Sequence, residues 1–368
     1  MTVAASGDAV VAADVEGVVA RGEDDFRRLA GRRILLTGGT GFVGSWLLET
    51  ITAAVDQFGL DTTAIVLSRH PEVFERKHPH LAAHAGVRLV RADVRSLPDD
   101  VIRTIGTVDM IVHGASASVA AGDALSPFDV IDTIVDGMRS MLRVAAGSGR
   151  VPFLLLSSGA VYGAPGDQPL DESYPVAPLA SSPTSAYGEA KRLAEVMGSV
   201  ATADGVADVA TARLFTFVGP YLPLDQNFAV GNFLADALAG RDIEVAGDGT
   251  AVRSYLYAAD LAAWLWAIAM RGMPGRCYNV GSDAPTTIAE LAGAVASLDG
   301  GRPNVVIRGE RREGAAPARY VPSTVRARTE LGLEQTVTLH EALRRTADWH
   351  RMRRLPRPLV SPLGSGPA

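Results

Sequence analysis

The sequence contains little cysteine and no long apolar run. Its single cysteine, Cys277, excludes an internal disulfide, and no group of Cys and His residues has the spacing of metal ligands. No apolar stretch approaches the roughly 20 residues that a membrane-spanning helix needs. The N-terminus also lacks the charged start and apolar block of a secretory signal. These absences predict a cytoplasmic protein without a metal site or a membrane partner.

An excess of positive charge is absent as well. The 368 residues carry a net charge of −6, which argues against a nucleic-acid partner because a surface that binds nucleic acid is normally basic. Hydrophobic residues make up 47% of the chain and charged residues 21%, close to the composition of globular proteins. A chain of this length can form one large or two modest domains with a substantial core.

Strand-like and helix-like segments alternate along most of the chain. Short apolar segments predict strands, and segments with apolar residues at helical spacing predict helices. The alternation predicts an α/β fold, in which a doubly wound parallel sheet is covered by helices on both faces. The predicted strands are residues 33–37, 64–68, 87–91, 110–113, 153–157 and 210–215, and the main predicted helices are residues 45–55, 129–146, 186–203, 232–239 and 261–270.

A glycine-rich turn joins the first predicted strand to the first predicted helix. Its sequence is Gly38-Gly-Thr-Gly-Phe-Val-Gly44. A helix N-terminus presents free N–H groups and a positive dipole end, and both favour a pyrophosphate. Gly38 and Gly41 allow the backbone to approach the phosphates, and Gly44 allows the helix to pack against the strand. The turn therefore predicts a Rossmann domain that binds a nicotinamide dinucleotide, with contacts from Gly38, Thr40, Gly41, Phe42 and Val43.

The Gly-x-x-Gly-x-x-Gly spacing of this turn resembles that of the extended short-chain dehydrogenase/reductase family, the nucleotide-sugar epimerases and dehydratases. The resemblance recurs over roughly residues 32–333. It implies that Asp93 and Val94 contact the adenine of the dinucleotide. It also implies that the end of the fourth strand, His113-Gly114-Ala115, lines the cofactor, and that Ser116 contacts the substrate.

The second predicted strand ends in Ser68-Arg69, and this end bears on the choice of cofactor. Enzymes that use NAD usually place an acid here to hold the ribose 2′-hydroxyl, but no acid occurs before Glu72. An Arg beside a Ser suits a 2′-phosphate and slightly favours NADP. Arg69 stacked on the adenine would serve either dinucleotide, so both NAD and NADP stay open.

A phenol and an ammonium group are paired in Tyr187-Gly-Glu-Ala-Lys191. Residues at positions i and i+4 share one face of a helix, and a nearby cation favours the phenolate and lowers the pKa of the tyrosine. The resemblance implies that Lys191 also binds the nicotinamide ribose. It places the catalytic hydroxyl on Ser158, which shares the substrate proton with Tyr187. The implied reaction is the oxidation of a sugar carbinol.

The two residues after Ser158 separate the possible reactions. By resemblance, 4,6-dehydratases carry an Asp-Glu pair at these positions and UDP-glucuronate decarboxylases a Glu at the second, whereas this chain has Gly159 and Ala160. An epimerase needs only rotation of a 4-keto intermediate and hydride return to its other face. We therefore expect a nucleotide-sugar 4-epimerase. A nucleotide-sugar dehydratase, decarboxylase or 4-keto-sugar reductase on the same scaffold is the alternative.

The resemblance extends to the predicted substrate lobe. Arg253 and Arg312 match arginines that grip the diphosphate of a nucleotide-diphosphate sugar, for which a planar guanidinium is suited. Thr216, Asn227 and Asn232 are further candidates for substrate contacts. Helices 129–146 and 186–203 commonly pair with their copies in this family, which implies a homodimer.

The domain organisation follows from these assignments. The dinucleotide-binding Rossmann domain is predicted to span residues 31–221, with residues 250–282 returning to it. A smaller, interleaved C-terminal α/β lobe takes the substrate. Asp260 is expected to cap the helix at 261–270, and Trp264 and Trp266 to lie in the core. The remaining parts are an N-terminal extension of residues 1–30 that packs on the domain or frays, the lobe segments 222–249 and 283–350, and a tail of residues 351–368.

Overall fold

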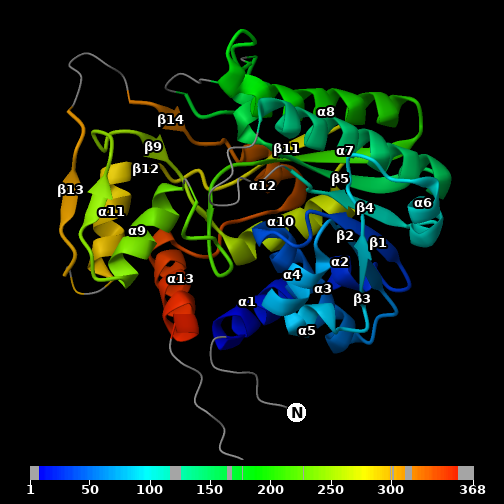
Figure 1. The fold of residues 1–368 in the computed structure, drawn as a ribbon, viewed down its shortest axis with the longest axis horizontal. Helices are drawn as coiled ribbons and strands as arrows, with labels where there is room; N and C mark the ends of the chain where they lie inside the picture. Colours follow the sequence, from blue (N-terminus) through cyan, green and yellow to red (C-terminus); the bar gives the residue numbers. More distant parts are fainter. Residues whose placement is uncertain are drawn as a thin grey trace, which may run out of the picture.

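The structure is a computed structural model that describes residues 8–116, 126–163, 168–175, 177–226, 228–298, 300, 302–310 and 317–354. Figure 1 shows a central sheet with helices on both faces and a smaller lobe at its left. Within the described ranges, no helix is long and apolar enough to cross a lipid bilayer.

Seven parallel strands form the central sheet, in the order β11-β6-β5-β4-β1-β2-β3. This order reverses between β1 and β4, and ligands of such sheets bind outside the carboxyl ends of the strands at that point. The Rossmann-type doubly wound sheet predicted from the sequence is confirmed. The strands are β1 (Arg33–Thr37), β2 (Thr63–Ser68), β3 (Val87–Arg91), β4 (Met110–His113), β5 (Val151–Ser158), β6 (Ala207–Leu214) and β11 (Cys277–Val280).

The two faces of this sheet belong to different core clusters. Side chains alternate along a strand, so Ile34 and Leu36 of β1 face one cluster while Leu35 faces the other. The first cluster includes side chains from α3 (Phe42–Phe58) and α10 (Ala258–Arg271). The second includes side chains from α6 (Asp99–Ile105), α7 (Pro127–Ser148) and α8 (Ala186–Ala203). The bounds of α8 coincide with the helix predicted from the sequence.

The N-terminal segment is part of the core. Of the two alternatives for residues 1–30, the structure shows packing: α1 (Asp8–Arg21) and α2 (Glu23–Arg27) contact α3 and α10, and Val18 and Phe26 are fully buried. Asp14 of α1 accepts hydrogen bonds from Tyr257 and Arg345, which ties the segment to the C-terminal part of the chain. Residues 1–7 lie outside the described residues.

The smaller lobe is built from chain segments that lie before and after the segment that returns to the sheet. It contains α9 (Ala229–Leu238), α11 (Ile288–Ser297) and the parallel pair β8 (Ile243–Val245) and β13 (Val305–Ile307). A second small sheet has the order β12-β9-β14. The chain returns at β10, which pairs with β7, and continues through α10 to β11. The strands not yet bounded are β7 (Phe217–Val218), β9 (Val252–Arg253), β10 (Leu256–Tyr257), β12 (Thr286–Thr287) and β14 (Arg319–Tyr320).

The predicted cap at Asp260 is wrong. Asp260 lies inside α10, which begins at Ala258, and its carboxylate accepts hydrogen bonds from Thr336 N at 2.9 Å and Val337 N at 3.1 Å. The buried acid therefore orders the loop before α13 (Leu339–Arg354) instead of its own helix. Trp264 and Trp266 are buried as expected. The remaining short helices are α4 (Pro71–Lys77), α5 (Pro79–Ala82), η1 (Gly159–Tyr162), η2 (Pro183–Ser185) and α12 (Val325–Leu331).

The predicted tail begins inside α13. This helix continues to Arg354, four residues into the segment 351–368 that the sequence suggested as a tail. The rest of that segment lies outside the described residues.

Candidate active site

The glycine turn is the point where β1, β4 and α3 approach most closely. Gly38 has a φ of 73°, and a Cβ at this position would lie 2.6 Å from the carbonyl of Gly114 at the end of β4. A Cβ on Gly44 would overlap the backbone of Gly38 and Gly39. Both positions therefore require glycine, the first for its backbone conformation as well as its size.

The N-terminus of α3 is open toward the predicted pyrophosphate. Gly41 is the N-cap residue, and among the described residues no side chain caps the helix there. Gly41 is exposed, and Phe42 and Val43 are half-buried in the first turn, as is Thr40 before it. The N–H groups of a first helical turn have no acceptor within the helix, so this end fits an anion. The cofactor contacts of these residues remain predictions.

The ends of β2 and β3 hold the predicted adenine-side residues. The exposed guanidinium of Arg69 hydrogen-bonds to none of the described residues, while the hydroxyl of Ser68 accepts from His70 N. Asp93 is held by Arg95, whose Nη2 donates to it at 2.7 Å and keeps the pKa of the Asp93 carboxyl below its usual value. Val94, the other predicted adenine contact, is buried. Arg69 is thus available to a cofactor, and Asp93 is a charged, oriented acceptor.

His113 is a buried support for the end of β4. Its Nδ1 lies 2.7 Å from the hydroxyl of Thr37, and that hydroxyl accepts from Ala115 N at 3.1 Å. Burial, with the nearby charge of Lys191, lowers the pKa of His113 to about 3, so the ring is neutral and shares one hydrogen bond with the Thr37 hydroxyl. The side chain thereby joins β1 to β4, and the cofactor contacts of His113, Gly114 and Ala115 remain predictions.

The predicted catalytic hydroxyls converge at the carboxyl ends of β4 and β5. The hydroxyl of Tyr187, in the first turn of α8, interacts with the side chains of Ser158 and Ser116, and both lower its pKa. Ser158 ends β5 and accepts from Ala160 N at 3.1 Å, while Ser116 follows β4. Residues from three separate elements thus form one cluster, as the resemblance implied for Ser158 and Tyr187.

Lys191 lies below this cluster and is buried. Its Nζ donates to the carbonyl of Leu156 at 2.8 Å and stands 5.9 Å from the centre of the Tyr187 ring. Burial lowers the pKa of Lys191 to about 8. Burial also raises the pKa of Tyr187, against the effect of the two serines. The expected lowering of the Tyr187 pKa is therefore wrong for the protein without cofactor, because burial outweighs the lowering by Ser158 and Ser116.

An ion pair between Glu195 and Arg213 lies next to Lys191 and Ser157. Glu195 follows Lys191 by one helical turn, accepts from Ser157 at 2.6 Å and pairs with Arg213 of β6 at 2.7 Å. Arg213 also donates to the hydroxyl of Tyr162 at 3.0 Å. Glu195 is not among the residues predicted from the sequence, although its position on the Tyr187–Lys191 face of the helix is a usable signal.

Tyr320 is a second residue that the sequence did not reveal. It lies on β14 in the smaller lobe, and its hydroxyl stands against Gly159 and interacts with the side chain of the neighbouring Ser158. Its ring centre is 4.7 Å from that of Phe215. No spacing or motif in the sequence links it to Ser158, because only the fold brings β14 to the end of β5.

The predicted substrate residues have different placements. Arg253 of β9 pairs in register with Tyr320 of β14, and its guanidinium lies 5.9 Å from the Tyr320 ring centre, close to the hydroxyl cluster. Thr216 is half-buried and its carbonyl accepts from Leu256 N at 3.0 Å. Asn232 is exposed on α9. Asn227 and Arg312 lie outside the described residues.

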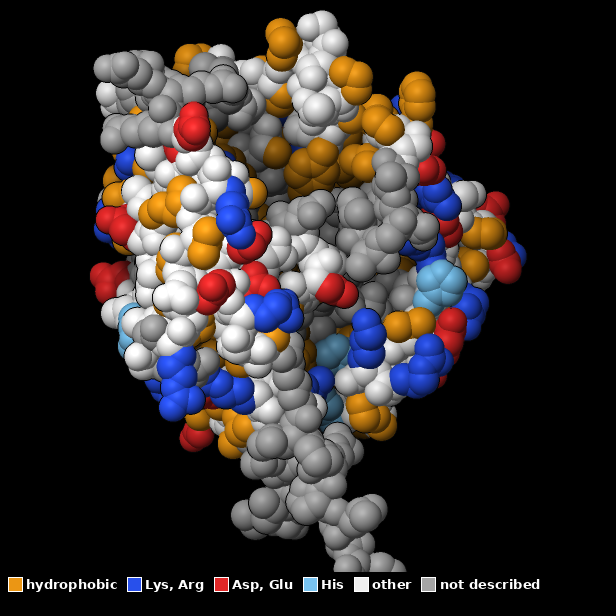
Figure 2. Space-filling model, turned by 60° about the vertical axis from the view of Figure 1, so that its left-hand side comes forward, with side chains coloured by type: hydrophobic (Ala, Val, Ile, Leu, Met, Phe, Trp, Pro, Cys, Tyr) orange, Lys and Arg blue, Asp and Glu red, His pale blue; other side chains and the backbone are white. Residues whose placement is uncertain are grey.

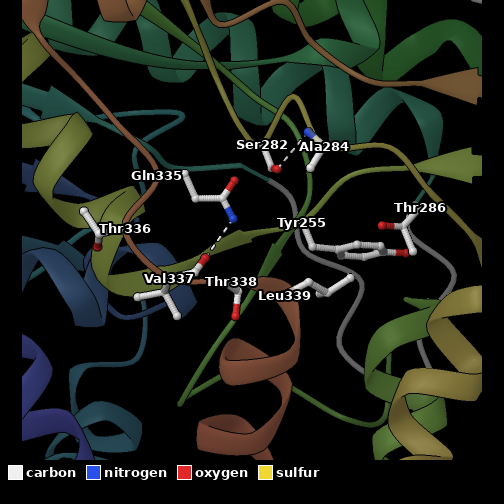
Figure 3. Close-up of a pocket in the computed structure, with 9 residues that line it drawn as sticks. All are labelled: Tyr255, Ser282, Ala284, Thr286, Gln335, Thr336, Val337, Thr338 and Leu339. Atoms are coloured by element: carbon white, nitrogen blue, oxygen red, sulfur yellow. Dashed lines mark hydrogen bonds between the residues drawn. The ribbon is translucent and has the colours of Figure 1, made fainter.

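A separate cavity of about 310 Å³ lies at the start of α13 (Figure 3). Its lining is uncharged, and none of the predicted site residues belongs to it. The lining residues are Tyr255, Ser282, Ala284, Thr286, Gln335, Thr336, Val337, Thr338 and Leu339. Over the described ranges, His, Cys, Asp and Glu side chains form no group of three or more that could hold a metal ion.

Comparisons with known proteins agree with this architecture. The model of the NAD dependent epimerase/dehydratase family matches residues 34–281. UDP-glucuronic acid decarboxylase 1 of Arabidopsis thaliana is 31% identical over 87% of this chain and 70% of its own length. The structure of epimerase Mth375 from Methanothermobacter thermautotrophicus has a TM-score of 0.76 at 26% identity, over 90% of this chain and 96% of that chain.

DesIV, a dTDP-glucose 4,6-dehydratase from Streptomyces venezuelae solved with NAD bound, has a TM-score of 0.73 at 25% identity, over 88% of this chain and 98% of that chain. The decarboxylase relatives favour the alternative left open by the sequence over the 4-epimerase that was expected first. With the glycine turn, the seven-stranded sheet and a family model that covers more than half of its length, the chain belongs to the NAD dependent epimerase/dehydratase family.

Proposed function

We propose that this protein oxidises the C4 hydroxyl of a UDP-linked sugar, and that the sugar is glucuronate, which it decarboxylates. The observation that carries the proposal is the convergence of Tyr187, Ser158 and Ser116 at the carboxyl ends of β4 and β5, beside the glycine turn. The names of the curated relatives support the substrate.

The hydroxyl cluster can perform the proton transfer at C4. Tyr187 takes the proton of the substrate hydroxyl, and Ser158 holds the same oxygen in place. A bound dinucleotide would accept the hydride from C4. The raised pKa of Tyr187 means that the base depends on its hydrogen-bond donors and on the buried ammonium of Lys191 to reach the phenolate form.

The cofactor would lie along the carboxyl edge of the sheet. The first turn of α3 would hold its pyrophosphate, and Lys191 the nicotinamide ribose. We take NAD as the cofactor, because the family description and the DesIV structure name NAD. The exposed Arg69 favours NADP instead, so titrating the purified protein with each dinucleotide decides between them.

Decarboxylation is compatible with the residues after Ser158. Oxidation of glucuronate at C4 puts a ketone in the β position to the carboxylate, and such acids lose carbon dioxide without a base. The electron pair moves onto the C4 oxygen, where Tyr187 and Ser158 can donate hydrogen bonds. A 4,6-dehydratase must also move protons at C5 and C6, which Gly159 and Ala160 cannot do.

A UDP-sugar 4-epimerase is the second candidate. Ala160 stands where the resemblance places a Glu in decarboxylases, so a carboxyl group for proton return at C5 is missing from that position. Epimerisation needs no such group, because the hydride returns to the opposite face of the C4 ketone.

Product masses test the proposal. The purified protein is incubated with UDP-glucuronate, and in parallel with UDP-glucose, in the presence of NAD. We expect UDP-glucuronate to lose the mass of carbon dioxide, because C5 takes up a proton after decarboxylation and a bound dinucleotide would return the hydride to the C4 ketone, whose oxygen regains the proton from Tyr187. A product of unchanged mass with a new sugar spectrum would identify the epimerase, loss of water a dehydratase, and steady consumption of a reduced dinucleotide a reductase. Absence of any product from a panel of nucleotide sugars would contradict the proposal.

The outer surface of α8 supports a homodimer. Leu193, Val196 and Val200 lie at helical spacing on one side of α8 and are exposed, as is Phe128 at the start of α7. Exposed hydrophobic side chains are visible along the upper end of the molecule in Figure 2, the end where α8 lies in Figure 1. A row of apolar side chains in solvent is typical of an interface, so we propose that two copies pair through α7 and α8.

A further inference from the structure

The space beside Ser158 is filled by a hydroxyl from the smaller lobe. A Cβ on Gly159 would lie 2.8 Å from Cζ of Tyr320 and closer still to its hydroxyl. Position 159 therefore has no side chain, and Tyr320 occupies the volume that one would take. This is the position where an acid follows the catalytic hydroxyl in the dehydratases that the sequence resembles.

The hydrogen-bonding capacity of Ser158 sets the direction of its bonds. A hydroxyl has one proton to donate and two lone pairs to accept with. Ala160 N donates to Ser158 at 3.1 Å and uses one lone pair. The hydroxyls of Tyr187 and Tyr320 also interact with the Ser158 side chain, and Tyr320 stands against the adjacent Gly159, so these two hydroxyls are the partners for the remaining lone pair and the proton. Before substrate binds, a Tyr187 phenolate can only accept, so Ser158 donates to it and accepts the proton of Tyr320. Once Tyr187 has taken the substrate proton, the Ser158 proton is free to hold the substrate oxygen.

We propose that Tyr320 is a positioning residue of the active site: its hydroxyl donates to Ser158 and so directs the Ser158 proton onto the oxygen of Tyr187. The proposal rests on the proposed function, in which Tyr187 is the base. It makes the smaller lobe a part of the proton-transfer machinery, because β14 delivers the third hydroxyl to a cluster whose other members come from the Rossmann domain.

The surroundings of Tyr320 keep it a donor. Its ring packs against Phe215, and burial raises the pKa of its hydroxyl, so it stays protonated when Tyr187 ionises. Charged and titratable groups approach the two phenols from each neighbouring element. They are Arg253 of β9 and Tyr162 of η1 around Tyr320, and Lys191 of α8 near Tyr187, with Glu195 of α8 and His113 of β4 in turn near Lys191.

The consequence is a measurable shift in the ionisation of Tyr187. Without the Tyr320 hydroxyl, Ser158 loses its donor and can turn its proton away from Tyr187. The phenolate then loses part of its stabilisation, and its pKa rises. A hydrogen bond to a charged group corresponds to about one pKa unit or more, and an indirect effect falls at the lower end of this range.

Tyrosinate absorbance tests the proposal without any substrate. The full-length protein with NAD is titrated with base, and the Tyr187 signal is obtained by subtracting the matching Tyr187→Phe titration from both the wild type and Tyr320→Phe. We expect the Tyr187 midpoint to rise by about one pH unit in Tyr320→Phe. Tyr255→Phe is the matched control, since it removes another buried lobe hydroxyl that lines the separate cavity, and it should leave the midpoint unchanged.

Gly159→Ala provides a second variant. Its added Cβ pushes the Tyr320 hydroxyl away from Ser158, so the Tyr187 midpoint should rise as it does in Tyr320→Phe. An unchanged midpoint in Tyr320→Phe, or an equal shift in Tyr255→Phe, would overturn the proposal.

Kinetics separates this inference from the proposed function. If the enzyme turns over UDP-glucuronate, the acid limb of kcat/KM moves to higher pH in Tyr320→Phe, while KM changes little. A titration shift in a protein that converts no nucleotide sugar would refute the proposed function and leave the role of Tyr320 standing. Turnover by the wild type without a midpoint shift in the variant would refute the role of Tyr320 alone.

Discussion

Helices α3 and α8 lie on opposite faces of the same sheet and serve the site in different ways. The first turn of α3 offers backbone N–H groups, and its close contact with β1 depends on glycines. The first turns of α8 offer side chains, namely the Tyr187 phenol and the Lys191 ammonium. α3 is covered by α1, α2 and α10, whereas α8 leaves an apolar row exposed. Binding at the α3 turn, which uses backbone groups, is therefore expected to suffer when a substitution adds volume. Catalysis at α8, which uses side chains, is expected to suffer when a substitution removes a functional group.

The largest effect is expected from Tyr187→Phe. It removes the base on α8 and leaves the packing of the ring, so kcat should fall by about 10³-fold while the fold and the dinucleotide affinity stay the same. Turnover of UDP-glucuronate and a fluorescence titration with NAD measure the two quantities. Activity close to the wild-type value would remove Tyr187 from the mechanism.

Gly44→Ala and Gly41→Ala test whether the packing of α3 against β1 depends on the absence of a side chain. A Cβ on Gly44 overlaps the backbone of Gly38, and overpacking of this kind should lower the free energy of unfolding by about 2–3 kcal/mol. A Cβ on Gly41 lies 3.5 Å from Gly38 O, an ordinary contact, so this variant should keep its stability and lose affinity for the dinucleotide. Thermal unfolding and cofactor titration distinguish them, and equal destabilisation by both would contradict the assignment.

Lys191→Met tests the buried charge on α8. The pKa of Lys191 in the folded protein, about 8, is below the ordinary lysine value of 10.5, so above pH 8 the unfolded chain binds more protons than the folded one. The contribution of Lys191 to the free energy of unfolding of the wild type should therefore rise by about 1–3 kcal/mol from pH 8 to 10.5. Lys191→Met should lack this rise. Chemical denaturation at several pH values measures it, and parallel curves would refute the shifted pKa.

The smallest effect on catalysis is expected from Val196→Asp. It puts a charge into the exposed row of α8, far along the helix from Tyr187, and should convert a dimer into monomers. Sedimentation velocity measures the assembly. Monomeric wild-type protein would refute the proposed dimer.

Local patterns determined much of this protein. Residues close together in the sequence predict the glycine turn, the parallel sheet and the bounds of α8. A tight turn needs glycine, and a buried helix face needs apolar residues at fixed spacing. The pairing of Tyr187 with Ser158 could also be anticipated, since the family resemblance places the two residues in one catalytic site.

Only the tertiary structure decided the rest. Tyr320 is remote in sequence and reaches Ser158 because β14 pairs with β9 in the smaller lobe. Asp260 orders a distant loop instead of capping its helix, because α10 begins at Ala258, two residues before Asp260. The raised pKa of Tyr187 likewise reflects how deeply the fold buries it, and burial is a sum over many neighbours that no local spacing encodes.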